Sequence, residues 1–154
     1  MAISNDSFPG GGIPPGFAAD PDDPYWRFMS QAAVAEAKAR GCTLLLANGD
    51  VTAEARPAEV EEARRMLDGF GTLGGARHVG PDDPSAYFVT RGNHDRAHTG
   101  DLYAACSGSD AKDCYRDAFA ASYDPGSSHF SVTVGTGRAR YRFVGLDSND
   151  GEAT

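Results

Sequence analysis

The order of apolar and polar positions along the chain predicts helices and strands in alternation. Residues 25–40 repeat apolar side chains at helical spacing and are followed by Gly41, a residue that commonly ends a helix. Residues 43–47 form a continuous apolar run, as expected for a strand covered on both faces. Residues 57–68 begin with proline and carry an apolar stripe, which predicts a second helix. Residues 86–90 predict a second strand, so the order is that of an α/β fold.

The C-terminal part of the chain predicts a helix and a β-hairpin. Residues 112–122 gather aromatic and small side chains on one side, as in a helix. Residues 129–134 alternate apolar and polar positions, residues 135–137 can turn, and residues 139–147 supply a second strand. We expect this last strand to be buried. By contrast, residues 4–24 are rich in proline and glycine and predict a long loop.

Size and charge narrow the class of protein. The chain has 154 residues, which suits one domain, and its 40% hydrophobic content is an ordinary globular value. With 14 Lys and Arg residues against 22 Asp and Glu residues, the formal net charge is −8, so the chain lacks the basic field that binds nucleic acid. No apolar run approaches the roughly 18 residues of a membrane helix. We therefore expect neither a nucleic-acid nor a membrane partner, and the oligomeric state stays open.

Three cysteines leave the cellular compartment open. Their positions lack the CxxC spacing of zinc ribbons and redox motifs. We expect Cys42 to be a buried free thiol, because it precedes an apolar strand. Cys106 and Cys114 flank a short polar loop that a disulfide would close, and two unpaired thiols are the alternative. A bridge would favour an exported protein over a cytoplasmic one.

Two segments share a layout of chemical interest, in which an apolar strand breaks at a glycine into a polar loop. Gly49 and Asp50 follow the first strand, and the sequence Gly-Asn-His-Asp at residues 92–95 follows the second. In open α/β sheets, ligands bind beyond the carboxyl ends of the strands. We therefore expect Asp50, Asn93 and His94 to cluster there, on parallel neighbouring strands. Carboxylate, carboxamide and imidazole groups suit divalent metals that act on phosphates.

Each motif also has an ordinary interpretation. Aspartate and glycine after a strand are common turn residues, so a Gly-Asp pair alone indicates little more than a turn. Gly-Asn-His-Asp after a buried strand is rarely met by chance, and Asp95 beside His94 can orient the imidazole ring. Arg91 and Arg96 flank this loop. We interpret both as solvated arginines, with a phosphate contact as the alternative.

A third motif, Phe-x-Gly-Leu-Asp-Ser, lies at residues 143–148. Together with the Gly-Asp and Gly-Asn-His-Asp motifs, it resembles the calcineurin-like metallophosphoesterase superfamily over about residues 41–148. The resemblance implies an α/β fold that is part of a four-layer α/β/β/α sandwich. It also implies two divalent or trivalent metal ions, such as Mn, Fe or Zn, and a metal-bound hydroxide that attacks a phosphate mono- or diester.

The resemblance also assigns roles to residues of this chain. Asp50 would bridge the two metal ions, and Asn93 would bind the second. His94 would stabilise the transition state or protonate the leaving oxygen. Asp95 would hold the ring of His94.

The chain departs from the family pattern in two places. The family begins with a strand that ends in Asp-x-His, but residues 3–8 offer Asn5 and Ser7 in that register. The family's later histidine and its Gly-His-x-His motif have no match in the chain. We therefore expect residues 1–154 to be a single incomplete metallophosphoesterase domain that binds metal weakly and shows little activity alone, with residues 1–24 as loop.

Two other functions remain open. A metal-free regulatory or binding module could retain the fold, which the missing first motif suggests. An unrelated acidic binding domain is the third possibility, and it requires Asp50 and His94 to lie far apart.

Overall fold

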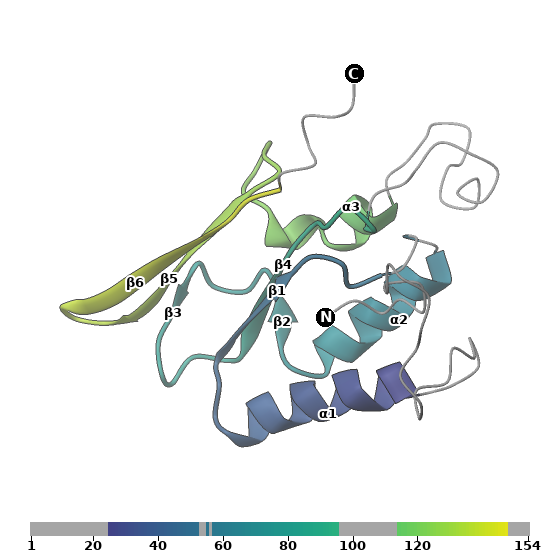
Figure 1. The fold of residues 1–154 in the computed structure, drawn as a ribbon. Coiled ribbons are helices and arrows are strands. Elements are labelled where there is room, and N and C mark those ends of the chain that lie inside the picture. Colours follow the sequence, from purple (N-terminus) through teal and green to yellow (C-terminus); the bar gives the residue numbers. More distant parts are fainter. Residues whose placement is uncertain (1–24, 53–54, 56, 96–113, 148–154) are drawn as a thin grey trace, which may run out of the picture.

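A computed structural model describes residues 25–52, 55, 57–95 and 114–147 of the chain. These residues form two three-stranded sheets, one of which is covered by helices (Figure 1). The helices are α1 (Tyr25–Ala39), α2 (Pro57–Asp68) and α3 (Cys114–Ala118), and a short 3-10 helix, η2 (Ala120–Ser122), follows. The predicted α/β class is confirmed.

The first sheet contains the two strands that carry the motifs. In spatial order its strands are β1 (Leu44–Asn48), β4 (Ala86–Thr90) and β2 (Thr72–Leu73), and β4 is parallel to both neighbours. Asn48 pairs with Thr90, so β1 and β4 end at the same level and their following loops start side by side. Among the described strands, β1 lies at the edge of the sheet, and its residues are half-buried except for exposed Asn48. Leu45 and Ala47 pack toward the helices, and Leu44 and Leu46 pack toward the second sheet, so both faces are partly covered, as the sequence predicts.

The central strand β4 is buried on both faces. Tyr87 and Val89 point into a cluster with all three α-helices, whereas Ala86 and Phe88 point into a cluster with the second sheet. This division follows from the strand geometry, in which successive side chains face opposite sides. The rings of Phe88 and Phe130 lie 5.0 Å apart at the contact between the sheets. The described residues therefore form three layers: helices, first sheet and second sheet.

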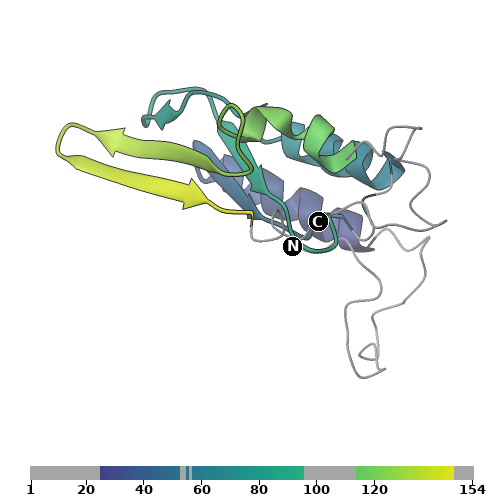
Figure 2. The same ribbon diagram turned by 90° about the horizontal axis from the view of Figure 1, so that it is seen from above.

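The second sheet is built around a long hairpin. In spatial order its strands are β3 (His78–Val79), β5 (Phe130–Thr136) and β6 (Ala139–Gly145), with β5 and β6 antiparallel as the sequence predicts. The hairpin extends away from the helices and the first sheet (Figure 2). Phe130 and Val132 of β5 are buried, but β6 is exposed along nearly its whole length. The expectation that this last strand is buried is wrong, because β6 lies at the sheet edge and the hairpin extends past the first sheet.

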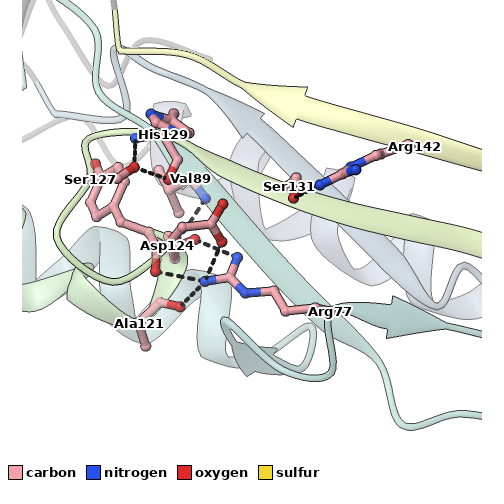
Figure 3. A network of polar contacts seen from close by, with 10 residues as sticks. Arg77, Val89, Ala121, Asp124, Ser127, His129, Ser131 and Arg142 are labelled. Carbon is pink, nitrogen blue, oxygen red and sulfur yellow. Dashed lines mark hydrogen bonds and ion pairs between the residues drawn. The ribbon is translucent and has the colours of Figure 1, made fainter.

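Arg77 joins the second sheet to the segment that follows α3. Its guanidinium donates hydrogen bonds to the carbonyl oxygens of Ser122 at 2.8 Å and Tyr123 at 2.7 Å, and it lies 3.5 Å from the carboxylate of Asp124 (Figure 3). It also lies 4.9 Å from the centre of the Phe88 ring. Carbonyl groups at a helix end lack partners within the helix. Arg77 satisfies them and anchors this segment to the central strand.

The cysteine expectations have different outcomes. Cys42 lies in the connection between α1 and β1 and is exposed, so the prediction of a buried thiol is wrong. The reason is that the apolar run is an edge strand, so its approach lies outside the core. Cys106 lies outside the described residues, as do residues 1–24, so the disulfide and the predicted loop stay predictions. None of the described helices is long and apolar enough to cross a membrane.

Candidate metal centre

The loops that follow β1 and β4 touch each other at two glycines. We call residues 49–52 and 92–95 together the loop junction. Gly49 has a φ of +78°, and a Cβ atom at this position would lie 2.6 Å from the backbone nitrogen of Gly92. A Cβ atom at Gly92 would overlap both the backbone and the carboxylate of Asp50. Only glycine permits such an approach. The motif glycines thus bring the two loops into contact.

Asp50 lies at the centre of the loop junction. Its φ of +50° falls in the left-handed region, which aspartate adopts more readily than most residues. Its Oδ1 accepts a hydrogen bond from the backbone N–H of His94 at 3.1 Å. Within the described ranges, no donor reaches Oδ2 of this half-buried carboxylate. One oxygen therefore orients the side chain, and the other is available to a ligand.

Asp95 holds the loop junction together from inside the fold. Its carboxylate is fully buried. It accepts hydrogen bonds from the N–H groups of Val51 at 3.3 Å, Thr52 at 2.8 Å and Gly92 at 3.0 Å, and from the Thr52 hydroxyl at 2.7 Å. None of these bonds involves the ring of His94. The geometry gives Asp95 a role in joining the loops, which the motif did not indicate.

Burial sets the protonation behaviour around Asp95. It raises the pKa of the Asp95 carboxyl above its ordinary value, although the hydrogen bonds from Gly92, Thr52 and Val51 act in the opposite direction. The hydroxyl of Tyr115 in α3 donates to the carbonyl oxygen of Thr90 at 2.9 Å. Burial, together with the nearby Asp95 carboxylate, raises the pKa of the Tyr115 phenol. Tyr115 therefore stays a protonated donor at neutral pH.

Arg91 forms a buried ion pair with Asp147. Its Nε lies 2.8 Å from Oδ2 of Asp147, and the two side chains are only 7% and 2% exposed. Asp147 follows β6, so this pair ties the loop after β4 to the end of the second sheet. The expectation of a solvated arginine is wrong for Arg91, because the fold shields both charges. Arg96 lies outside the described residues, and contact of either arginine with phosphate stays a prediction.

A pocket of about 400 Å³ opens beside the loop junction. Asn48 and Thr90 line it from the strand ends of the first sheet, and Asn93 lines it from the loop after β4. Val144 and Leu146 line it from the end of the second sheet. The pocket therefore lies beyond the carboxyl ends of β1 and β4, where open α/β sheets bind ligands.

The oxygen donors of the loop junction fit part of a metal shell. Asp50 offers a carboxylate oxygen, and exposed Asn93 offers a carboxamide oxygen beside the pocket. Such oxygens are suitable ligands for Mn²⁺ and similar ions. In the part of the chain that the structure describes, no group of three or more His, Cys, Asp or Glu residues is placed to hold a metal. These residues therefore supply two of the expected ligands and not a complete shell.

The sequence did not lead us to expect two residues, Thr52 and Tyr115, whose hydrogen bonds stabilise the loop junction. Thr52 is fully buried and contributes two of the four hydrogen bonds to Asp95. Tyr115 reaches the end of β4 from α3. A polar residue two positions after Asp50 was a usable signal for Thr52. Nothing in the helical pattern of residues 112–122 indicated where the Tyr115 hydroxyl would bind.

Comparisons with known proteins give no relative: no family model, curated protein or solved structure matches this chain. The motifs and the geometry of the loop junction are therefore what bears on function. An unrelated acidic binding domain required Asp50 and His94 to lie far apart, whereas a hydrogen bond joins them. The metallophosphoesterase hypothesis and the metal-free module remain.

Proposed function

We propose that the chain carries the site of a metal-dependent phosphoesterase, a hydrolase of the calcineurin-like type. The observation that carries this proposal is the hydrogen bond from the His94 N–H to Asp50, which joins two motifs that are distant in sequence. The close approach of Gly49 and Gly92 supports it, because it fixes the loops that hold both residues. The residues that follow these strand ends carry carboxylate, carboxamide and imidazole groups, a set that suits hydrolysis of a phosphate mono- or diester.

The proposed roles follow the chemistry of each group. Asp50 and Asn93 would hold the metal ions, of which two are implied, with Mn, Fe or Zn as candidates. When bound, such ions supply Lewis acidity toward the phosphate and lower the pKa of water. His94 would stabilise the developing negative charge or protonate the leaving oxygen. Asp95 keeps His94 in position by fixing the loop to Thr52.

We also assign the three described layers to a four-layer α/β/β/α sandwich. The support lies in the second sheet, whose inner face packs on the first sheet through Phe130 and Val132. Its outer face carries Val144, which is 55% exposed, beside half-buried Ser131. A helix layer over this part of the outer face would complete the sandwich.

A metal-free binding module is the second candidate. Its support is that the described residues offer Asp50 and Asn93 as ligands but no cluster of three acidic, histidine or cysteine groups. In this alternative, the loop junction would serve only to shape the pocket. The two candidates differ in their response to Mn²⁺.

The proposal is tested by hydrolysis of p-nitrophenyl phosphate at high protein concentration with and without Mn²⁺. We expect slow Mn²⁺-dependent turnover, because two ligands hold metal weakly. His94→Ala should lower this rate by about 100-fold, and Asp50→Asn should abolish the dependence on Mn²⁺. His129→Ala changes an exposed histidine ahead of β5 and serves as the matched control. An equal rate in wild type and His94→Ala, or no response to Mn²⁺, would favour the metal-free module.

A further inference from the structure

Strand β6 and its turn carry arginines that have no acidic partner among the described residues. Outside the hairpin, ion pairs are formed by Arg40, Arg64, Arg65, Arg77 and Arg91. Arg138, Arg140 and Arg142 are exposed and form no ion pair with any residue that the structure describes. Arg142 donates only to the hydroxyl of Ser131, at 3.0 Å (Figure 3). Unpaired cations gathered on one strand are notable in a chain with a net charge of −8.

The same strand concentrates exposed apolar side chains. Tyr141 is 68% exposed and Phe143 is 43% exposed, and the two lie on the same face. Val144 is exposed on the opposite face of β6, and exposed Leu146 follows the strand. Among the residues whose side chains are described, which exclude residues 25–28, Met29 is the only other large hydrophobic residue with this exposure. Scattered apolar residues are ordinary on surfaces, but a contiguous group indicates an interaction site.

The strand register separates the two kinds of side chain. Tyr141 pairs with Val134 and Phe143 pairs with Val132, which places both aromatic rings on the face that includes the core side chain of Val132. Arg142 pairs with Thr133 and lies on the opposite face, because successive side chains alternate. β6 thus presents aromatic groups on one face and guanidinium groups on the other.

β6 also has an open edge. It pairs with β5 on one side and has no neighbour on its other side among the described strands. The hairpin extends away from the described helices, so none of them covers this edge (Figure 2). An open edge presents backbone N–H and C=O groups to which an extended segment can add as a further strand.

We propose that β6 docks an extended acidic segment of a partner protein as an added strand. Alternate carboxylates of the segment would pair with Arg140 and Arg142, and the apolar side chains between them would lie against Tyr141 and Phe143. A second copy of the chain is disfavoured, because pairing two β6 strands brings their arginines together. A polyphosphate is disfavoured by the net charge of −8. No residue of the loop junction takes part, so the proposal does not depend on a metal site at the loop junction.

The test is titration of the full chain with a labelled peptide of alternating glutamate and valine, followed by fluorescence anisotropy. We expect binding that weakens as salt rises and that falls by about tenfold in Arg140→Glu/Arg142→Glu. Arg40→Glu/Arg65→Glu changes the net charge equally at two exposed arginines, one directly after α1 and one in α2, and should bind as wild type does. An equal loss in both double variants would show a nonspecific charge effect and would overturn the proposal.

A second set of variants tests the proposed apolar contacts of Tyr141 and Phe143 with the peptide. Tyr141→Ser/Phe143→Ser should weaken peptide binding, whereas Met29→Ser in α1 should not, and circular dichroism should show each variant folded. Amides of residues 139–145 should gain hydrogen-exchange protection when the peptide binds. Absence of peptide binding, tighter binding of a single-stranded oligonucleotide, or wild-type dimers that Arg140→Glu/Arg142→Glu dissociates would each overturn the proposal.

Discussion

The charged groups of the loop junction are buried or half-buried and hydrogen-bonded, whereas those of strand β6 are exposed to solvent. In the junction, Asp95 is fully buried and accepts four hydrogen bonds from two loops. On β6, Arg140 and Arg142 are exposed, and no described acid pairs with them. Buried polar groups whose hydrogen bonds are all formed fix one geometry. Solvated charges add little to stability and can still bind a charged group of another molecule. The first arrangement suits a site that must hold its residues still, and the second suits a surface that recognises another chain.

The Arg91–Asp147 pair connects the two regions. Arg91 begins the loop after β4, and Asp147 follows β6, so the pair holds the loop junction to the base of the hairpin. The comparison therefore predicts large effects for changes at the junction and its ion pair, and small effects on β6.

Arg91→Ala should have the largest effect on stability. It would leave the carboxylate of Asp147 buried without its guanidinium partner, a loss of about 4 kcal/mol in the free energy of unfolding. The double variant Arg91→Ala/Asp147→Ala should lose less, because no charge stays buried. Arg40→Ala breaks an exposed pair with Glu36 and should cost at most about 0.5 kcal/mol. Urea unfolding measures all three, and similar losses for Arg91→Ala and Arg40→Ala would contradict the account.

Gly92→Ala should be the next most damaging change. The added methyl group would overlap Asp50, so the two loops must separate, and we expect a loss of about 3 kcal/mol. Gly137→Ala is the matched control on the hairpin turn, where φ is +58° and no atom lies within 4 Å of the added Cβ. It should cost about 1 kcal/mol from backbone strain alone. Thermal unfolding of both variants would refute this explanation if the two midpoints fell equally.

Asp95→Asn should have an intermediate effect that depends on pH. An amide has one acceptor oxygen where the carboxylate has two, so we expect a loss of about 2 kcal/mol at low pH. Burial raises the pKa of the Asp95 carboxyl, so the folded state binds its proton more tightly than the unfolded state does. The wild-type advantage over Asp95→Asn should therefore shrink as the pH rises from the ordinary carboxyl pKa of 3.8 through the raised value. An advantage that grows over this range would contradict the raised pKa.

Tyr141→Ser should have the smallest effect. The ring is 68% exposed, so its removal should change the free energy of unfolding by about 0.5 kcal/mol or less. Phe130→Ser, on the paired strand, removes a ring that is only 2% exposed and packs on Phe88. It should cost about 3 kcal/mol or more. Chemical unfolding that gave the two variants equal stability would mean that β6 is covered in solution.

The sequence was sufficient for the elements with strong local signals. Residues 57–68 form α2 with the predicted bounds, because proline begins the helix and glycine follows it. The parallel pairing of β1 with β4 was also predictable, because both apolar runs break at glycine into similar loops. Those loops contain Asp50 and His94, so their contact followed from the pairing.

The exposure of β6 and the partners of Arg91 and Asp95 depended on contacts that no local sequence pattern encodes. Alternating aromatic and arginine residues in β6 look the same whether the strand is covered or at an edge. Arg91 finds its partner 56 residues away, and Asp95 binds Thr52 from 43 residues away. Buried ion pairs and buried carboxylates are settled by the fold as a whole, which is why a solvated Arg91 was the natural expectation and why the hydrogen bonds that Asp95 accepts from the other loop were not predicted.

Manganese-induced broadening of amide NMR signals tests most directly whether the loop junction is a metal centre, because it detects even weak binding. We predict that low Mn²⁺ concentrations broaden the amides of residues 49–52 and 92–95 first in the wild-type chain. Asp50→Asn should abolish this selective broadening, whereas Asp117→Asn, at an exposed acid in α3, should leave it unchanged. Broadening that centres on another acidic surface, or that persists at the loop junction in Asp50→Asn, would contradict the account.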